Sequence, residues 1–275
     1  MALTGPAELL ATWEAGLDRD APGRALLLHR AARPEAGTDT LLSMPLGRRA
    51  TDLFALRRVL FGERMQVRVE CAACGEAMEF DLDASRFGAE GPEGPAGADG
   101  PSGPDGPSGP DGVPDGPLRL AEDGWEIEFR LPTVADLAAV ARAAADPAAA
   151  LDPPDPRDLL LTRCTVSAVR AGEPVPSDRL PRFLPEKLRR RLAEEAELAD
   201  PAADVTLNIA CPECGEATPA ELDIAAYLWT ELDAWARDVL LDVHLLATAY
   251  GWSEPEILAL SPQRRRYYLE LCADA

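Results

Sequence analysis

The segment Val67-Arg68-Val69-Glu70-Cys71-Ala72-Ala73-Cys74-Gly75-Glu76-Ala77 is echoed downstream by Leu207-Asn208-Ile209-Ala210-Cys211-Pro212-Glu213-Cys214-Gly215-Glu216-Ala217. In both copies an alternating segment leads into the motif CxxCGEA. The glycine after the second cysteine can take the positive φ that lets both sulfurs face one point. Four thiolates from two such turns make a tetrahedral zinc site without an open position. The sequence therefore predicts a structural Zn²⁺ bound by Cys71, Cys74, Cys211 and Cys214.

The two knuckles are far apart along the chain, with 136 residues between Cys74 and Cys211. Loop-closure entropy grows only with the logarithm of loop length, at about 0.6 kcal/mol per doubling. Zinc binding to small fingers contributes on the order of 10 to 16 kcal/mol, which exceeds that cost. We therefore expect the metal to join two halves of one fold.

Other interpretations of the cysteines compete with zinc. The CxxC pairs could be redox dithiols, but neither follows a strand and opens a helix, as a thioredoxin-type motif does. Two local disulfides would suit a secreted protein, and nothing in the sequence points to secretion. The remaining Cys164 and Cys272 lie in apolar helical contexts, where cysteine behaves as a small buried hydrophobe.

The chain has 275 residues, of which 47% are hydrophobic. This length permits one large domain or two smaller ones with a substantial core. The first residues lack a basic region followed by an apolar stretch, and no apolar run approaches the roughly 18 residues of a membrane span. We therefore predict a soluble cytoplasmic protein without membrane contacts.

The formal net charge of -21 argues against general nucleic-acid binding, because phosphate contacts need a concentrated positive surface. Local basic clusters occur nonetheless, at Arg57-Arg58, at Lys187 with Arg189-Arg190-Arg191, and at Arg264-Arg265-Arg266. They favour solvated helix faces or C-terminal turns, where cations oppose the helix dipole. Docking of an acidic partner surface is the alternative.

Apolar spacings of three and four predict an N-terminal helical region at 1–62, a helical middle region at 133–200 and C-terminal helices at 224–275. The expected helices are 6–17, 22–32, 47–61, one opened by the capping box Thr133 to Asp136, 157–170, 185–199, 224–250, and two short ones that follow Ser253 and Ser261.

The chain has two histidines. His29 falls on the apolar stripe of its expected helix, and we interpret it as a packing residue because no cluster of ligands surrounds it. His244 follows the stripe residue Val243 and is interpreted as a packed or interface side chain rather than a catalyst.

Alternation of apolar and polar residues predicts a β-hairpin from strands at 65–70 and 77–83, with the first knuckle at its tip. Its partner strand is expected at 124–131, where the residues alternate in the same way. The expected β unit comprises residues 63–87 and 118–132 as its first half, and residues 201–223 with the second knuckle.

Between these strands Gly recurs at every third position from Gly88 to Gly112, and Pro mostly follows it. A collagen triple helix needs three chains and favours hydroxyproline, whereas acidic and small residues fill the third position here. Because the repeat has no large apolar side chain to bury, residues 88–117 are predicted to be a disordered, extended insert. The fold class that follows is mainly helical α+β, with a small antiparallel zinc-ribbon-like β unit built from two distant knuckles.

The sequence contains no nucleophile elbow, Walker-type phosphate loop, dinucleotide fingerprint or metalloprotease His pair. General base catalysis would have to come from carboxylates, and no carboxylate pair stands out from the acidic background. We therefore expect a protein that is not an enzyme.

Further segments carry a family resemblance: Leu46-Gly47-Arg48-Arg49, Leu56-Arg57-Arg58-Val59-Leu60-Phe61-Gly62, Phe129-Arg130-Leu131-Pro132-Thr133, Tyr250-Gly251-Trp252-Ser253-Glu254, and residues 257–262 and 264–270. With the paired CxxCGE knuckles, they resemble the T4-type phage baseplate hub assembly chaperones of phage-tail-like contractile injection systems. The resemblance covers most of the chain except residues 88–117. It implies a non-enzymatic role in building the baseplate hub, with hub, spike or wedge proteins as partners.

Two functions of other classes stay open as alternatives. A zinc-ribbon nucleic-acid adaptor would use the arginine clusters, and the acidic balance argues against it. A CxxC thiol redox protein would need dithiols that react without first losing metal.

Overall fold

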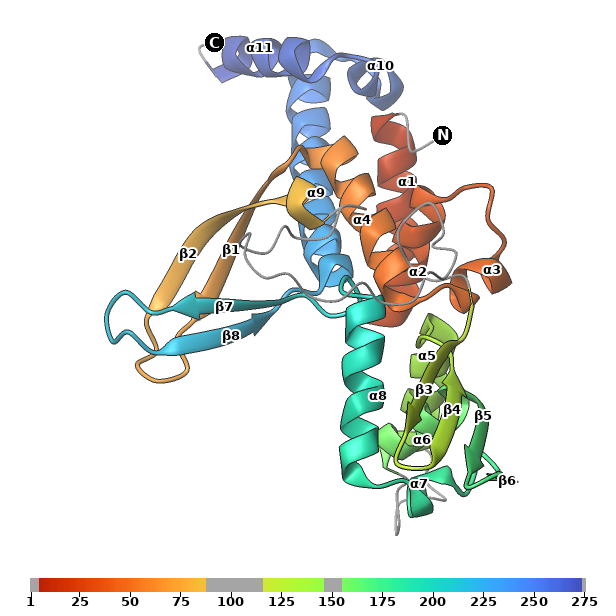
Figure 1. Ribbon diagram of the computed structural model, residues 1–275. Helices are drawn as coiled ribbons and strands as arrows, with labels where there is room; N and C mark the ends of the chain where they lie inside the picture. Colours follow the sequence, from red (N-terminus) through yellow and green to blue (C-terminus); the bar gives the residue numbers. More distant parts are fainter. Residues whose placement is uncertain (1–4, 88–115, 146–154, 274–275) are drawn as a thin grey trace. The chain divides into compact units, whose positions relative to one another are not determined.

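The computed structural model describes residues 5–87, 116–145 and 155–273. Most of the predicted disordered insert, residues 88–115, lies outside the described residues. The described chain is mainly helical α+β, as predicted, and forms two compact units, 1–35 with 223–275 and 36–222 (Figure 1).

In chain order the elements are α1 (Pro6–Gly16), α2 (Ala21–Ala32), α3 (Thr38–Ser43), α4 (Leu46–Phe61), β1 (Arg64–Glu70), β2 (Ala77–Asp83), η1 (Ala84–Phe87), β3 (Leu118–Glu122), β4 (Trp125–Phe129), α5 (Val134–Ala144), α6 (Pro156–Cys164), β5 (Thr165–Arg170), β6 (Glu173–Pro174), α7 (Leu180–Phe183), α8 (Glu186–Ala199), β7 (Thr206–Ala210), β8 (Ala217–Glu221), α9 (Ile224–Tyr250), α10 (Glu254–Leu258) and α11 (Pro262–Ala273).

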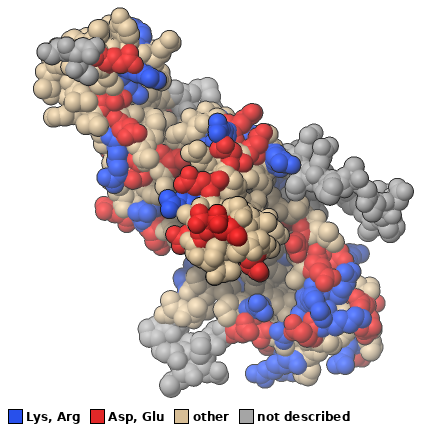
Figure 2. Space-filling model, turned by 90° about the vertical axis from the view of Figure 1, so that its left-hand side faces the viewer, with Lys and Arg blue, Asp and Glu red and all other residues tan. Residues whose placement is uncertain are grey.

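Charged side chains of both signs lie on the face drawn in Figure 2, where Lys and Arg are interspersed with Asp and Glu. Within the described ranges, no helix combines the length and the apolar composition that a membrane span requires.

The basic clusters differ from the prediction of simple solvated helix faces. Arg57 is buried and donates to the carbonyl oxygens of Gly62 and Arg64, each at 2.6 Å. Arg265 is also buried and forms an ion pair with Asp242 at 3.0 Å. A buried guanidinium must be paired or hydrogen-bonded. These two arginines therefore make structural contacts within their own units and are not solvated.

The unit formed by residues 1–35 and 223–275 is organised by α9, against which α1, α2, α10 and α11 pack. The Asp223 carboxylate caps α9 by accepting from the Ala225 and Ala226 amides, and Gly251 ends the helix with φ +71°. The Trp229 ring lies against Gly16, where an added Cβ would come within 2.3 Å of it. A bulkier residue at that position would displace the ring.

In residues 36–222, four strands form an antiparallel sheet in the order β3-β4-β5-β6. Asp123 and Gly124 join β3 to β4 with φ values of +51° and +76°, as a two-residue type I′ turn requires. Ile127 pairs with Leu120 on β3 and with Ala168 on β5. The prediction that residues 124–131 pair with the first knuckle hairpin is therefore wrong.

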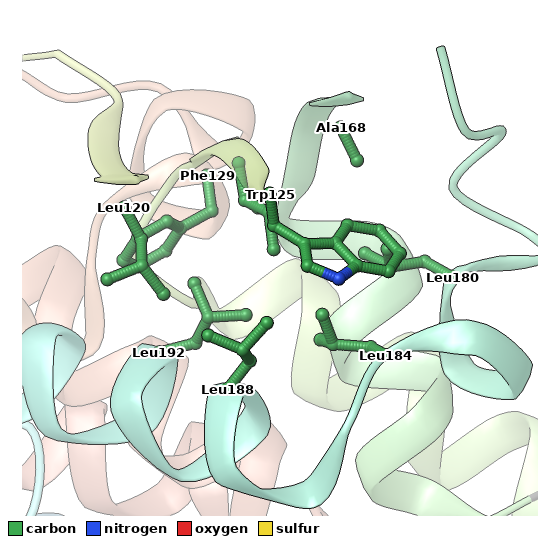
Figure 3. Close-up of a cluster of buried hydrophobic side chains, with 9 residues drawn as sticks. Leu120, Trp125, Phe129, Ala168, Leu180, Leu184, Leu188 and Leu192 are labelled. Atoms are coloured by element: carbon green, nitrogen blue, oxygen red, sulfur yellow. The ribbon is translucent and has the colours of Figure 1, made fainter. Parts of the chain in front are cut away.

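Strand β4 pairs with β3 and β5 because its inner, apolar face is buried in a core with α7 and α8 (Figure 3). Trp125, Ile127 and Phe129 are each at most 5% exposed and pack against leucines of α7 and α8. The remaining members of this cluster are Leu120, Ala168, Leu180, Leu184, Leu188 and Leu192. Burial of large apolar side chains stabilises by about 1.5 to 3 kcal/mol each, so the strand lies where a complete core is available.

The prediction of one helix over residues 157–170 is also wrong in its second half. The helix α6 ends at Cys164, and residues 165–170 form β5. Val166 and Val169 are β-branched, which disfavours helix and favours strand. The Ala171-Gly172 turn, with φ values of +49° and +86°, then returns the chain into β6.

Two of the segments that carry the family resemblance meet at the start of α4. The Leu46 amide donates to the Pro132 carbonyl at 3.1 Å, and Pro45 bridges Thr133. The Gly47 amide donates to the buried Asp200 carboxylate at 2.9 Å, and an added Cβ would lie 1.7 Å from Asp200 Oδ1. The glycine is therefore required for close approach.

Asp136 is the charged centre of the segment that follows β4. Its carboxylate is 1% exposed and accepts two bonds from Arg130, at 2.6 and 2.9 Å, and one from Arg163 at 3.0 Å. Together with the Thr133 amide and hydroxyl it completes the predicted capping box. Burial by itself raises the pKa of Asp136, but the bonds from Arg130 and Thr133 outweigh burial and hold that pKa well below its usual range.

We expect Asp136→Asn to lower the free energy of unfolding of residues 36–222 by about 2 to 4 kcal/mol. The substitution leaves two guanidinium groups without their anion, and both are partly exposed, which moderates the cost of a broken buried pair. Urea unfolding at pH 7 measures the effect. The exposed Glu79→Gln variant, which removes a surface pair with Arg68, is the control and should change stability by about 0.5 kcal/mol or less.

Low pH should weaken the stabilisation that the Asp136 carboxylate provides. Because the folded-state pKa of Asp136 lies below the unfolded value of about 3.9, its stabilisation is complete above that value and is lost as pH falls below it. Unfolding curves between pH 6 and pH 2.5 should show a steeper loss for the native chain than for Asp136→Asn. Parallel curves for the two proteins would contradict this assignment.

Candidate metal centre

Two equivalent hairpins carry the four cysteines. Pairing of β1 with β2 runs from Arg64–Asp83 to Glu70–Ala77, and that of β7 with β8 runs from Thr206–Glu221 to Ala210–Ala217. Residues 66–81 of the first hairpin correspond, with an offset of 140, to residues 206–221 of the second. The internal repeat in the sequence is therefore a repeat of structure.

Each knuckle is closed by the same two backbone hydrogen bonds. Cys71 N donates to Glu76 O at 2.8 Å and Gly75 N donates to Cys71 O at 2.9 Å, and the second knuckle repeats both bonds at 2.9 Å. Gly75 and Gly215 have φ values of +75° and +74°. The positive φ is the reason for glycine at these two positions. Lack of space is not, because an added Cβ would meet nothing within 4 Å at either one.

The structure brings the four predicted ligands together. Their sulfurs all lie within 4.8 Å of one another, and contacts cross from one hairpin to the other. Cys71 Sγ lies 3.6 Å from Cys214 Sγ, and Cys74 Sγ lies 3.7 Å from Cys211 Sγ. A tetrahedron with metal–sulfur bonds of about 2.3 Å has edges of about 3.8 Å. The arrangement therefore fits a tetrahedral metal ion.

A local two-fold relation governs the site, since exchanging the hairpins maps one cross-hairpin contact onto the other. Equivalent cysteines are also buried to the same degree. Cys71 and Cys211 are only 3% and 2% exposed, whereas Cys74 and Cys214 are both exposed. The inner cysteines pack with Met78, and with Val69 and Ile209 beside it. Each hairpin thus offers one inner and one outer sulfur.

The neighbouring thiols disfavour ionisation of Cys74 and Cys214, whereas the pKa of Cys71 is lowered. Backbone amides of Cys74 and Ala73 donate to Cys71 and lower its pKa to about 6. For Cys74 the Glu76 amide lowers the pKa, but the neighbouring thiols and burial outweigh it and raise the pKa to about 12. The pKa of Cys214 is raised as well, where the thiol of Cys71 and burial outweigh the Glu216 amide. A divalent cation would remove this repulsion, since metal binding releases thiol protons.

Thr218 breaks the two-fold relation and was missed in the sequence analysis. Its hydroxyl is buried without a hydrogen bond to any described residue, and Thr218 is one of the groups that lower the pKa of Cys71. The equivalent residue of the first hairpin is Met78, which is also buried. The sequence signal for Thr218 is the alignment of the two repeats, in which this polar residue occupies the position equivalent to the apolar Met78.

The other cysteines and histidines lie outside the cluster. Cys164 is buried in unit 36–222, and burial raises the pKa of its thiol to about 11. Cys272 is half-buried in α11. His29 is buried on α2, as a packing residue should be, whereas His244 is exposed on α9 and is not packed within its unit.

The fold and site define a class of α+β protein in which two distant CxxC hairpins meet at a four-cysteine cluster. Residues 36–226 match the family described as T4 bacteriophage base plate protein. The chain belongs to this family, and the matched range contains all four cysteines. No significant similarity was found to a curated protein or to a solved structure.

We expect Ser substitutions to fall into pairs that follow the two-fold relation. Cys71→Ser and Cys211→Ser should lose bound metal to the same extent, as should Cys74→Ser and Cys214→Ser. The inner pair should destabilise more because it also leaves a buried hydroxyl among apolar side chains. Elemental analysis and Co²⁺ titration of the chelator-treated protein measure this.

Cys164→Ala and Cys272→Ala are the matched controls, and both should retain metal. Equal metal content in all six variants would contradict the assignment of ligands.

Proposed function

We propose that the chain is a non-enzymatic structural or assembly component of the baseplate hub of a phage-tail-like contractile injection system. The carrying observation is that the range matched to the baseplate family contains both hairpins and the whole four-cysteine cluster. Family membership supports contacts with other baseplate proteins. The direct partners we propose are hub, spike or wedge proteins, met during assembly in the cytoplasm.

We also propose that Cys71, Cys74, Cys211 and Cys214 hold a structural Zn²⁺. Four thiolates in a tetrahedron select zinc or iron over magnesium and calcium, which prefer oxygen ligands. Zinc would supply two positive charges and four bonds, and it would fasten the hairpins without an open coordination position. A stable connection between distant segments is what a component of a load-bearing particle needs.

The alternatives have less support. The net charge of -21 and the interspersed charges in Figure 2 oppose a phosphate-binding surface. Both CxxC motifs lie on β-hairpin turns rather than at helix N-termini, where a helix would lower a thiol pKa for redox chemistry.

Deletion of the gene should leave few or no complete contractile particles in the electron microscope, and the native gene should restore them. A Cys71→Ser/Cys211→Ser gene should fail to restore them, because the hairpins then lose their metal. Elemental analysis of the purified native protein should give about one zinc per chain and little iron.

Complementation with Cys272→Ala is the control and should give normal particles. Normal contractile particles in the deletion strain would refute the baseplate role, and metal-free native protein would refute the zinc site independently.

A further inference from the structure

A groove of about 830 Å³ lies within unit 36–222, apart from the metal centre. One wall is α6 and the other is α8, and the end of β4 with the following Pro132 closes it. Phe129 and Leu192, which are 5% and 6% exposed, belong to the sheet core and form the apolar floor. Ala193 and Ala196 line the α8 wall, and their small side chains leave room between the helices.

The groove is elongated along its walls. The lining residues of α8 recur at helical spacing from Glu186 through Arg190 and Ala193 to Ala196, a length of about 15 Å. Those of α6 run from Arg157 to Cys164, about two turns. A long groove between two helices suits an amphipathic helix that places apolar side chains into it at every third or fourth residue. A small-molecule site would instead gather polar groups around one enclosed point.

Four arginines and two carboxylates line the groove, and two of the arginines are unpaired among the described residues. Arg157 and Arg190 are exposed and make no side-chain ion pair or hydrogen bond with any residue of the described ranges. The other two lining arginines are occupied, Arg130 by Asp136 and Arg189 by Asp158 at 2.5 Å.

The two acidic lining residues serve helix N-termini. Asp155 caps α6 by accepting from the Arg157 amide at 2.8 Å, and Glu186 lies in the first turn of α8, where the dipole favours an anion. Arg157 and Arg190, which no described carboxylate pairs with, are therefore the two positions at which carboxylates of a ligand would find a cation.

From these observations we propose that the groove between α6 and α8 binds an amphipathic helix of a partner protein, apolar along one face and acidic along its edges. Apolar anchors of this helix contact the floor at Phe129 and Leu192. Its carboxylates pair with Arg157 and Arg190. The inference rests on the proposed function only in taking the partner to be another baseplate protein.

The first test uses synthetic probes and the full-length protein. A labelled helical peptide with Leu at i, i+3 and i+7 and Glu on the flanks is titrated by fluorescence anisotropy against the native chain and Arg157→Glu/Arg190→Glu. The charge reversal should weaken binding at least about tenfold at low salt, because like charges then face each other. The same peptide with Lys in place of Glu should bind the native chain weakly.

The matched control is Arg142→Glu/Arg182→Glu, which changes the same number of exposed charges on α5 and α7 outside the groove. It should bind the acidic peptide like the native chain. Unchanged metal content and circular dichroism in both double variants exclude misfolding. Equal affinity for the groove and control variants, or equal binding of the acidic and basic peptides, overturns the proposal.

The second test identifies the natural occupant. A photo-crosslinking amino acid at Ala193, on the groove wall, is compared with one at the exposed Leu198, on the opposite face of α8, during co-expression with candidate baseplate proteins. Ala193 should capture an acidic amphipathic helix of one baseplate protein, and Leu198 should not. Capture of a second copy of this chain, or of its own residues, would overturn the proposal.

The two tests separate the two claims. Charge-dependent peptide binding without any baseplate capture supports the groove and counts against the baseplate partner. Baseplate co-purification that is indifferent to Arg157→Glu/Arg190→Glu supports the proposed function and counts against the groove.

Discussion

Two hairpins that are far apart in sequence meet at four sulfurs, which all lie within 4.8 Å of one another. In a chain-entropy treatment, closing a loop of this length costs about 5 kcal/mol, and four crowded thiols add electrostatic repulsion on ionisation. The apolar side chains packed with the inner cysteines are Met78, which is buried, and Val69 and Ile209, which are only partly buried. A bound divalent cation would offset both the closure cost and the repulsion at once, because it converts mutual repulsion into four shared bonds.

The two-fold relation between the hairpins determines how the four sulfurs are arranged. Repetition of the same register and the same closing hydrogen bonds places one inner and one outer sulfur from each hairpin around a common point. The relation ends at Thr218 and Met78, where one hairpin presents a hydroxyl and the other a thioether. That difference makes the surroundings of Cys71 unlike those of Cys211, although their burial is nearly the same.

The segment between the hairpins has a separate role. Its sheet buries Trp125 and its neighbours under α7 and α8, and Asp136 ties the end of β4 to α5 and α6 through Arg130 and Arg163. This core shares no residue with the cysteine cluster, and the groove between α6 and α8 lies beside it. A baseplate component built in this way would combine a fastened pair of hairpins with a surface for a partner.

Local features of the sequence determined the knuckles and most helices. Spacing of the cysteines and the glycine after them encode a turn, and caps such as Thr133, Asp223 and Ser253 encode helix starts, because each acts within a few residues. Asp123-Gly124 also encodes the two-residue turn that joins β3 to β4, and the β-branched Val166 and Val169 favour a strand over residues 165–170. Tertiary structure alone decided that β4 also pairs with β5 and that Arg57 is buried. Alternation indicates which residues form a strand, whereas the choice of partner depends on which neighbour completes the burial of its apolar face.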